Sequence, residues 1–198
     1  MNQQTPIDHK IILNWIQENT TVLDLGCGDG KLLSLLIKEK HVHAQGIELQ
    51  DKAIHQCIAA GLNVIQQDID TGLSEYTDKT FDYVILNQTL QQVKKPHFAL
   101  KEALRISKKV IVGIPNFAHI KARLQIFFQG KVPVTTALPY QWYNTPNLHF
   151  LSIKDFKNYC KNKNIQINQT AYITSGKKTP CLPNLLAETA LFQLSKQK

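Results

Sequence analysis

The chain has 198 residues, of which 43% are hydrophobic and 19% are charged, and its formal net charge is +8. This length suits one domain with a sizeable core and excludes two large ones. No apolar run is long enough to span a membrane, and the first residues lack the pattern of a secretion signal, so we expect neither.

Hydrophobic periodicity predicts helices alternating with strands over the first 113 residues. The predicted helices cover 7–18, 31–38, 51–60 and 96–105, and the predicted strands cover 22–25, 41–47, 63–66, 81–86 and 109–113. Such alternation is typical of parallel βαβ units with right-handed crossovers.

The pattern changes after Pro115. Residues 115–150 form a long irregular stretch with one predicted helix at 116–128. Seven of the sixteen aromatic residues lie in it: Phe117, Phe127, Phe128, Tyr140, Trp142, Tyr143 and Phe150. A stretch of this length is typical of a lid or a binding surface, and its aromatic content argues against disorder. We expect it to form a cap inserted into the domain.

Regular structure resumes at 152–162, where Ser152 and Asp155 have the spacing of a capping box at the start of a helix. Residues 165–174 alternate as a strand does. Residues 185–194 fit either a helix or a strand, and we interpret them as a last, antiparallel strand. The whole chain, 1–198, is then a single doubly wound α/β domain with a seven-stranded, mostly parallel sheet.

A glycine-rich turn, VLDLGCGDGK, joins the first predicted strand to the next helix and places glycines at 26, 28 and 30. Such a turn lets the backbone approach a ligand. The dinucleotide pattern G-x-G-x-x-G would need a glycine at Lys31, and the P-loop pattern would need Ser or Thr at Leu32. The spacing therefore argues against both phosphate-binding motifs.

Acidic residues follow the next two predicted strands. Glu48 could accept hydrogen bonds from both ribose hydroxyls of an adenosine, and Asp68 could accept one from an adenine amino group. Both would lie at the carboxyl edge of the sheet, where open α/β sheets bind ligands. We interpret Asp70 and Asp82 as surface carboxylates.

These segments resemble the class I S-adenosylmethionine-dependent methyltransferases over roughly residues 18–113. The resemblance is carried by DLGCGDG at 24–30, GIE at 46–48, QD at 67–68 and FDYV at 81–84. It implies S-adenosylmethionine as cofactor, with S-adenosylhomocysteine as product or inhibitor. The cofactor-binding residues that it implies are Asp24, Gly26, Cys27, Gly28, Gly30, Glu48, Leu49, Asp68, Ile69 and Asn87.

A narrower resemblance links most of the chain to the MetW family of methionine biosynthesis proteins. Its most specific segment runs from IPNFAHIKARLQIFF to NTPNLHF, which lies outside the general methyltransferase core. The resemblance implies a cytoplasmic protein that works with a homoserine O-acyltransferase of the MetX type. It leaves open whether a methyl group is transferred.

Methyl transfer needs little beyond alignment of the acceptor, although a base helps when the acceptor is a hydroxyl. Asn87, Gln88 and Thr89 offer no base and do not match the N-P-P-[YF] motif. The catalytic residue is thus unknown, and the weak candidates are His119, Tyr140 and His149. Two functions remain: an S-adenosylmethionine-binding accessory of the acyltransferase, and a methyltransferase acting on a small molecule.

The aromatic stretch itself allows three interpretations. Tyr140, Trp142 and Tyr143 could shape an acceptor pocket, or they could form a protein-binding surface together with Lys121 and Arg123. They could also simply cover the end of the sheet.

The charge is distributed unevenly. Residues 1–100 carry 8 Lys and Arg against 12 Asp and Glu, a net charge of −4, whereas residues 101–198 carry 15 against 3, a net charge of +12. The basic half fits a solvated lysine-rich surface or a surface for an acidic protein partner. No nucleic-acid-binding motif accompanies it, so we expect no nucleic acid partner.

Cysteine and histidine spacing predicts no metal site. The four cysteines are Cys27, Cys57, Cys160 and Cys181, and no two have CxxC spacing. Dispersed thiols suit a reducing compartment, which again indicates the cytoplasm. His41 and His43 form an H-x-H pair, but no acidic third ligand is identifiable.

Overall fold

The computed structural model describes residues 5–179 and 181–197. Its centre is a sheet with the strand order β3-β2-β1-β4-β5-β8-β6-β7. The strands are β1 (Thr21–Leu25), β2 (His43–Glu48), β3 (Val64–Gln66), β4 (Phe81–Asn87), β5 (Ser107–Pro115), β6 (Ile165–Thr174), β7 (Lys177–Lys178) and β8 (Thr189–Lys196). The helices are α1 (Ile7–Trp15), α2 (Lys31–Lys40), α3 (Asp51–Ala59), the 3₁₀ turn η1 (Ile69–Thr71), α4 (Pro96–Ile106), α5 (Ile120–Gln129), α6 (Ile153–Asn162) and α7 (Pro183–Leu186).

The strand order places a crevice between β1 and β4. The first five strands pair in parallel, and the chain runs outward from β1 to β3 before it returns to β4 on the other side of β1. At such a reversal the connections leave the carboxyl ends of the two strands in opposite directions and open a ligand crevice. The doubly wound, mostly parallel sheet predicted from the sequence is confirmed.

The predicted number of strands was wrong, because the described residues form a sheet of eight strands and not seven. The additional strand, β7, has two residues and pairs only with the end of β6, so it is too short to show a periodicity. The last strand also begins later than predicted. Residues 185–186 lie in α7, which starts at Pro183, and β8 runs antiparallel between β5 and β6.

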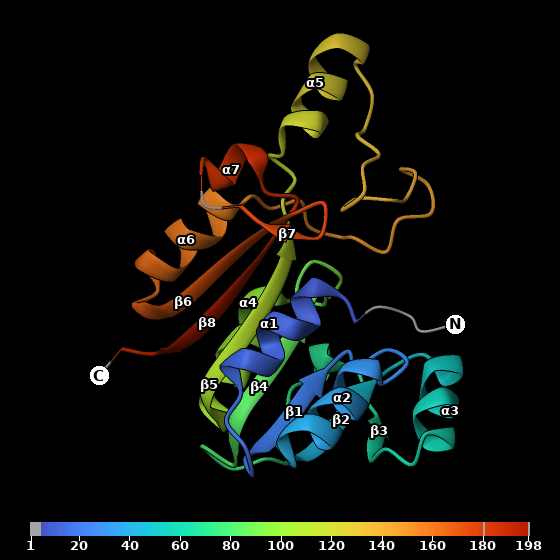
Figure 1. Ribbon diagram of the computed structural model, residues 1–198, viewed down its shortest axis with the longest axis vertical. Coiled ribbons are helices and arrows are strands. Elements are labelled where there is room, and N and C mark those ends of the chain that lie inside the picture. The colour runs from blue at the N-terminus through green and yellow to red at the C-terminus, as the bar shows by residue number, and fades with distance from the viewer. Residues whose placement is uncertain (1–4, 180, 198) are drawn as a thin grey trace.

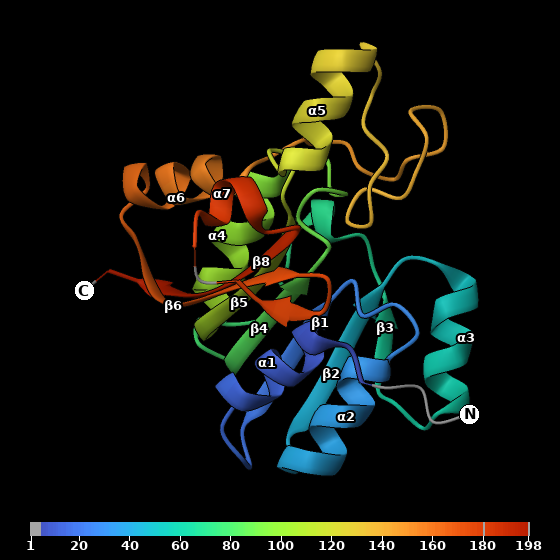
Figure 2. The same ribbon diagram turned by 45° about the horizontal axis from the view of Figure 1, so that its top comes forward.

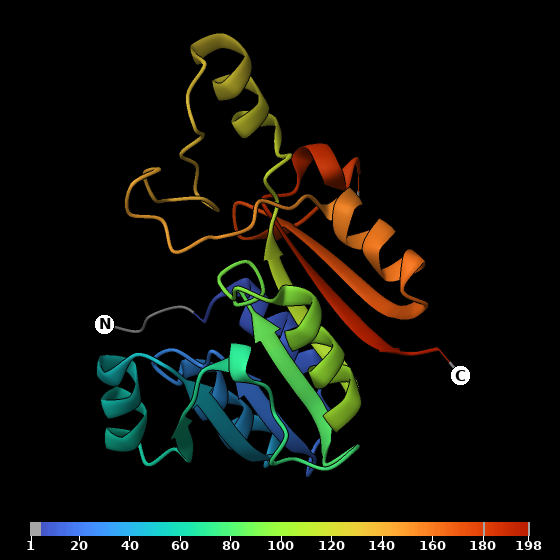
Figure 3. The same ribbon diagram turned by 180° about the vertical axis from the view of Figure 1, so that it is seen from behind.

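Helices cover both faces of the sheet. In Figure 1 α1 lies in front of the sheet, and in Figure 3, seen from behind, α4 and α6 lie in front. Figure 2 shows α2 beside β2, next to α3. Strands covered on both faces are apolar along nearly their whole length, which explains why the predicted strands read as short continuous hydrophobic runs.

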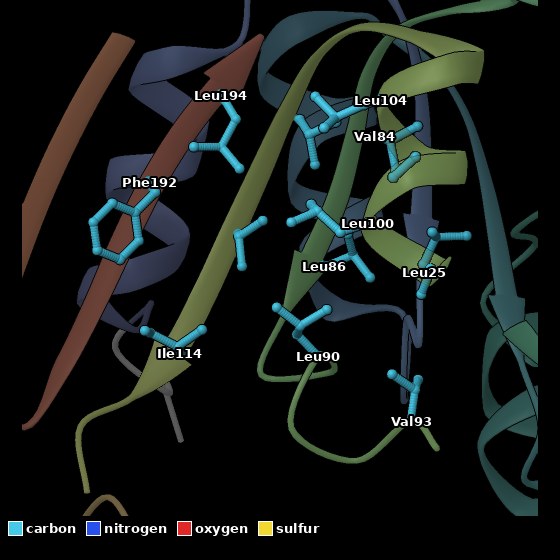
Figure 4. Packing of buried hydrophobic residues seen from close by; sticks show 14 of the residues in the cluster. Leu25, Val84, Leu86, Leu90, Val93, Leu100, Leu104, Ile114, Phe192 and Leu194 are labelled. Atoms are coloured by element: carbon cyan, nitrogen blue, oxygen red, sulfur yellow. The ribbon is translucent and has the colours of Figure 1, made fainter. Parts of the chain in front are cut away.

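Alternate residues of β4 divide the core into two. Val84 and Leu86 point toward α4, where Leu100 and Leu104 pack against them, and Figure 4 shows this layer continuing to Phe192 on β8. Tyr83 and Ile85 point to the opposite face. There they join the cluster that includes Ile12 of α1 and Leu36 of α2.

The start of α6 is fixed by a capping box, as predicted. Ser152 Oγ accepts a hydrogen bond from the Asp155 backbone N–H at 3.1 Å, and Asp155 Oδ2 accepts one from the Ser152 backbone N–H at 3.0 Å. Two N–H groups that the helix leaves free are thereby satisfied.

Beyond the sheet lies the segment 115–150 that we expect to form a cap, of which Pro115 still belongs to β5. Its helix, α5, begins at Ile120, four residues later than predicted, because Asn116 leaves the strand and bonds to Ala118 and to the carbonyl oxygen of Ala187. α5 projects away from the rest of the molecule, and the chain returns through a long loop (Figure 1).

A carboxyl group lies inside the central strand. Asp24 of β1 is only 3% exposed. Burial, and to a lesser extent the nearby charge of Glu48, raise the pKa of its carboxyl group to about 7. The folded state therefore favours the protonated form of Asp24, whereas the unfolded chain ionises near pH 4.

Replacing Asp24 by Asn should make the protein more stable at pH 8. Between about pH 4 and pH 7 the unfolded chain ionises Asp24 while the folded state keeps it protonated, so the free energy of unfolding of the wild type falls over this range and the loss is complete above pH 7. One pKa unit corresponds to about 1.4 kcal/mol, so we expect the Asp24→Asn melting temperature to exceed that of the wild type by about 3 °C or more at pH 8. The two temperatures should converge at pH 4.

Thermal unfolding followed by circular dichroism at both pH values measures this difference. Asp29→Asn is the control, because Asp29 lies on the same turn but its pKa is lowered by its hydrogen bonds to Lys31. A melting temperature of Asp24→Asn that falls below the wild type at pH 8 would contradict the prediction.

Candidate functional site

A cavity of about 670 Å³ opens at the crevice between the carboxyl ends of β1 and β4. Its wall comes from the ends of four parallel strands and from the loop that follows α5. The lining residues are Gly26, Gly28, Glu48, Leu49, Gln50, Ala53, Gln67, Asp68, Ile69, Asp70, Asn87, Gln88, Thr89, Gln92, Val93, Lys94, Tyr140, Asn144 and Pro146.

The glycine turn forms one side of the cavity. Gly26 has φ +77°, and a Cβ atom there would lie 2.7 Å from Thr89 Oγ1, so any side chain would be both strained and obstructed. Thr89 is held in place because its hydroxyl group donates to the carbonyl oxygen of Leu25 at 2.9 Å. Gly28 has φ +56° and no atom within 4 Å of where its Cβ would lie. Its backbone is therefore exposed to the cavity.

The Glu48 carboxylate is bound by three backbone N–H groups. Oε2 accepts from Gly28 at 2.8 Å, and Oε1 accepts from Leu49 at 2.8 Å and from Gln50 at 3.0 Å. The side chain is buried and belongs to the cavity wall. These hydrogen bonds fix the orientation of both oxygen atoms. Oε1 accepts two of them, whereas Oε2 accepts one and keeps a lone pair for a hydroxyl donor.

Asp68 and Asp70 organise the next part of the wall. Asp68 Oδ1 accepts from the Asp70 backbone N–H at 2.9 Å and caps η1. Asp70 accepts from the backbone N–H groups of Lys94 and Lys95 at 2.8 and 2.7 Å. The Asp70 carboxylate, interpreted from the sequence as a surface group, thus ties η1 to the segment after β4.

Asn87 connects the cavity wall to the N-terminal helix. Its Nδ2 donates to Asp8 Oδ2 at 3.0 Å, and its Oδ1 contacts Gly113 on β5, where a side chain would clash. No hydrogen-bond partner for this Oδ1 occurs among residues 5–179 and 181–197. Asn87 therefore joins α1, β4 and β5 at the edge of the cavity.

Three of the predicted cofactor residues support the turn without lining the cavity. Asp24 lies in the strand below, and Gly30 packs against Leu62 and Cys57. The Cys27 Sγ lies 4.0 Å from the Cys57 Sγ, and burial raises the pKa of both thiols.

Of the three weak catalytic candidates, the structure brings only Tyr140 to the cavity wall. His119 is buried before α5, where its Nδ1 accepts from the Lys121 backbone N–H at 3.3 Å and burial lowers its pKa. His149 Nε2 lies 3.0 Å from the Val93 carbonyl oxygen and faces a second, smaller cavity beside α4.

Sequence reasoning missed several residues of the wall. Thr89 and Gln92 follow β4 in a polar segment, and the position of Thr89 two residues after the end of that strand was the signal that could have pointed to it. Asn144 and Pro146 come from the loop after α5 and carried no signal, because nothing in the sequence fixes where that loop returns to the sheet.

The wall carries more negative than positive charge. Glu48, Asp68 and Asp70 line it, and Lys94 is the cation among the described lining residues. Such a wall favours a ligand with positive charge.

Residues 5–179 and 181–197 contain neither a cluster of metal ligands nor a membrane-spanning helix. No three His, Cys, Asp or Glu side chains lie close enough together to share a metal ion. Over the same residues, every helix is too short or too polar to cross a bilayer.

Comparison with known proteins places the chain in a family. The family model described as methionine biosynthesis protein MetW matches residues 6–194. The bifunctional methionine biosynthesis protein MetXA/MetW of Rhodopirellula baltica is 32% identical over 205 residues, which cover 96% of this chain and 33% of the relative. The chain thus spans about a third of the length of that curated relative.

Solved structures share the fold. An S-adenosylmethionine-dependent methyltransferase of Thermotoga maritima, described as a possible histamine N-methyltransferase, superimposes with a TM-score of 0.67 at 19% identity, covering 96% of this chain and 87% of its own. An S-adenosylmethionine-dependent methyltransferase of Archaeoglobus fulgidus gives 0.70 at 14% identity, covering 96% and 91%. The fold is that of these methyltransferases, and the chain belongs to the MetW family of methionine biosynthesis proteins.

Proposed function

We propose that the protein binds S-adenosylmethionine in the cavity at β1 and β4 and supports or regulates a homoserine O-acyltransferase of methionine synthesis. One observation carries the cofactor assignment, which is the buried Glu48 carboxylate held by three N–H groups at the end of β2. Its Oε2 keeps a free lone pair and is suited to accept from a ribose hydroxyl.

The other residues of the wall fit the same ligand. The exposed backbone at Gly28 leaves room for the methionine part beside the glycine turn. The exposed Leu49 side chain offers an apolar cover for adenine, and Asp68 offers an acceptor for its amino group. When bound, the cofactor supplies an electrophilic sulfonium, and its positive charge suits a wall with three carboxylates.

The partner assignment is supported by the family and by one relative. In the Rhodopirellula baltica protein a MetW part occurs in the same chain as a MetXA part, and two activities joined in one polypeptide commonly act together. S-adenosylmethionine is made from methionine, so an accessory protein that binds it could report the supply of the end product. The proposal places both proteins in the cytoplasm, which suits the four free thiols.

The cavity wall favours this accessory function over methyl transfer that needs a base. None of its described lining residues is a histidine, and Tyr140 is half-exposed. Transfer to a small-molecule acceptor that is already nucleophilic needs only alignment and stays the alternative. S-adenosylhomocysteine would then be released as product, and in the accessory function it would compete for the cavity.

Replacing Glu48 should weaken cofactor binding. We expect Glu48→Gln to raise the dissociation constant for S-adenosylmethionine at least tenfold, because hydrogen bonds to a charged acceptor contribute about 1.5–3 kcal/mol. Isothermal titration calorimetry measures both constants, and Glu39→Gln on the exposed end of α2 is the matched control. Wild type that binds no S-adenosylmethionine, or equal binding by Glu48→Gln, rules out the cofactor assignment.

Adding the protein to a purified homoserine O-acyltransferase from the same genome should raise acylation of homoserine at least twofold. We expect S-adenosylmethionine to alter this effect while no S-adenosylhomocysteine accumulates, since the accessory function involves binding without turnover. Acyl transfer and S-adenosylhomocysteine can be followed in one reaction by mass spectrometry. An unchanged acylation rate argues against the accessory function, and stoichiometric S-adenosylhomocysteine would favour the methyltransferase alternative.

A further inference from the structure

α5 is a helix that this chain barely covers. It has ten residues, and of these only Ala122 is buried. Phe127 and Phe128 lie at its far end with 80% and 73% of their surface exposed, and their rings contact each other edge to face at 4.9 Å between centroids. The helix projects from the body of the protein (Figure 1), and among residues 5–179 and 181–197 little covers these two rings.

Such a helix has little reason to be stable by itself. Helices of this length are marginal in water, and most helices in proteins are stabilised by packing an apolar face. It is attached by the buried Ala122, by the ion pair of Lys121 with Glu188 at 3.7 Å, and by two hydrogen bonds between the Gln125 side chain and the Val134 backbone, at 2.9 and 2.8 Å. None of these contacts involves Phe127 or Phe128. The apolar end of α5 is therefore left for a surface outside this chain.

The loop that returns from α5 also exposes apolar side chains. Val132, Trp142 and Phe150 surround one small hollow, and Trp142 and Tyr143 are 72% and 69% exposed. We call the exposed side chains of Phe127, Phe128, Val132, Trp142, Tyr143 and Phe150 the cap surface. Aromatic residues gathered in this way are typical anchors of protein interfaces, and monomeric proteins rarely expose so many together.

The cap segment itself contains only basic charges. Residues 103–154 contain no Asp or Glu, and the cap carries Lys121, Arg123 and Lys131. Lys121 pairs with Glu188 at 3.7 Å, which leaves Arg123 and Lys131 as the cations of the cap for a partner. A symmetric dimer through the cap would use the same patch on both copies and bring these cations toward their equivalents. The charge therefore disfavours a second copy of this chain and favours a partner whose docking site is apolar with an acidic rim.

We propose that the cap surface is the docking site for the homoserine O-acyltransferase. This inference rests on the proposed function and adds the place of contact. The relative in which MetXA and MetW parts share one chain indicates that one MetW part accompanies one acyltransferase part. The cap surface supplies the apolar anchors and the basic rim for that contact.

The test is a binding titration with the purified acyltransferase and two matched double variants of the full chain. Phe127→Ser with Phe128→Ser removes two anchors of the cap surface. Ile58→Ser with Ile65→Ser removes two exposed apolar side chains from α3 and β3, at the other end of the sheet. We expect the first variant to bind the acyltransferase at least tenfold more weakly and the second to bind within twofold of wild type.

Trp142→Ser gives an independent check in the loop, where we also expect weaker binding. The melting temperature and the affinity for S-adenosylmethionine report whether each variant is folded, and both should match wild type for the Phe127 and Phe128 variant. If wild type binds and the cap variants bind equally well, the docking site is elsewhere and the proposed function stands. If wild type does not bind the acyltransferase at all, the proposed function fails first.

Sedimentation of the protein alone tests whether a second copy of the chain, and not the acyltransferase, occupies the cap surface. We expect a monomer at the concentrations of the titration. A dimer that dissociates on substitution of Phe127 and Phe128 would assign the cap surface to a second copy and overturn the proposal.

Discussion

The turn after β1 has to stay open to the cavity and yet be held firmly against β2. Two backbone bonds begin this attachment, since Gly26 and Cys27 both donate to the Ile47 carbonyl oxygen at 2.8 and 3.1 Å. The Glu48 carboxylate completes it by accepting from Gly28 and from the two residues after itself. The position of the turn, the mouth of the crevice and the orientation of the carboxylate all depend on these bonds.

The core of the fold could be predicted because its signals are local. Strands such as β4 are covered on both faces, so they appear as unbroken apolar runs, and the helices between them have one apolar side. β7 and α7 could not be predicted in the same way. Each spans only about one period of the pattern that would identify it. Both are held by contacts with β6, since β7 pairs with the end of β6 and the Thr174 hydroxyl group of β6 donates to the Leu186 carbonyl oxygen of α7.

The residues of the candidate site also fall into two groups, those that local sequence signals place and those that long-range contacts place. Five residues of the wall stand at the carboxyl ends of strands or within three residues after them, so the topology alone carries them to one edge of the sheet: Gly26, Gly28, Glu48, Asp68 and Asn87. The residues that the cap contributes depend on long-range contacts. His149 shows this, because its backbone and side chain bond to Gln91 and Val93 beside α4, which turns the imidazole away from the cavity.

The loop after α5 contributes side chains both to the cavity wall and to the cap surface, so it connects the two. Tyr140 and Asn144 line the cavity, whereas Trp142 and Tyr143 between them point into solvent. The loop is also fastened to the segment after β4, since the Leu148 backbone N–H donates to the Gln91 carbonyl oxygen at 2.9 Å. A partner that orders Trp142 and Tyr143 therefore orders part of the cavity wall. If the partner thereby changes the affinity of the cavity for its ligand by some factor, thermodynamic linkage requires that the ligand change the affinity for the partner by the same factor.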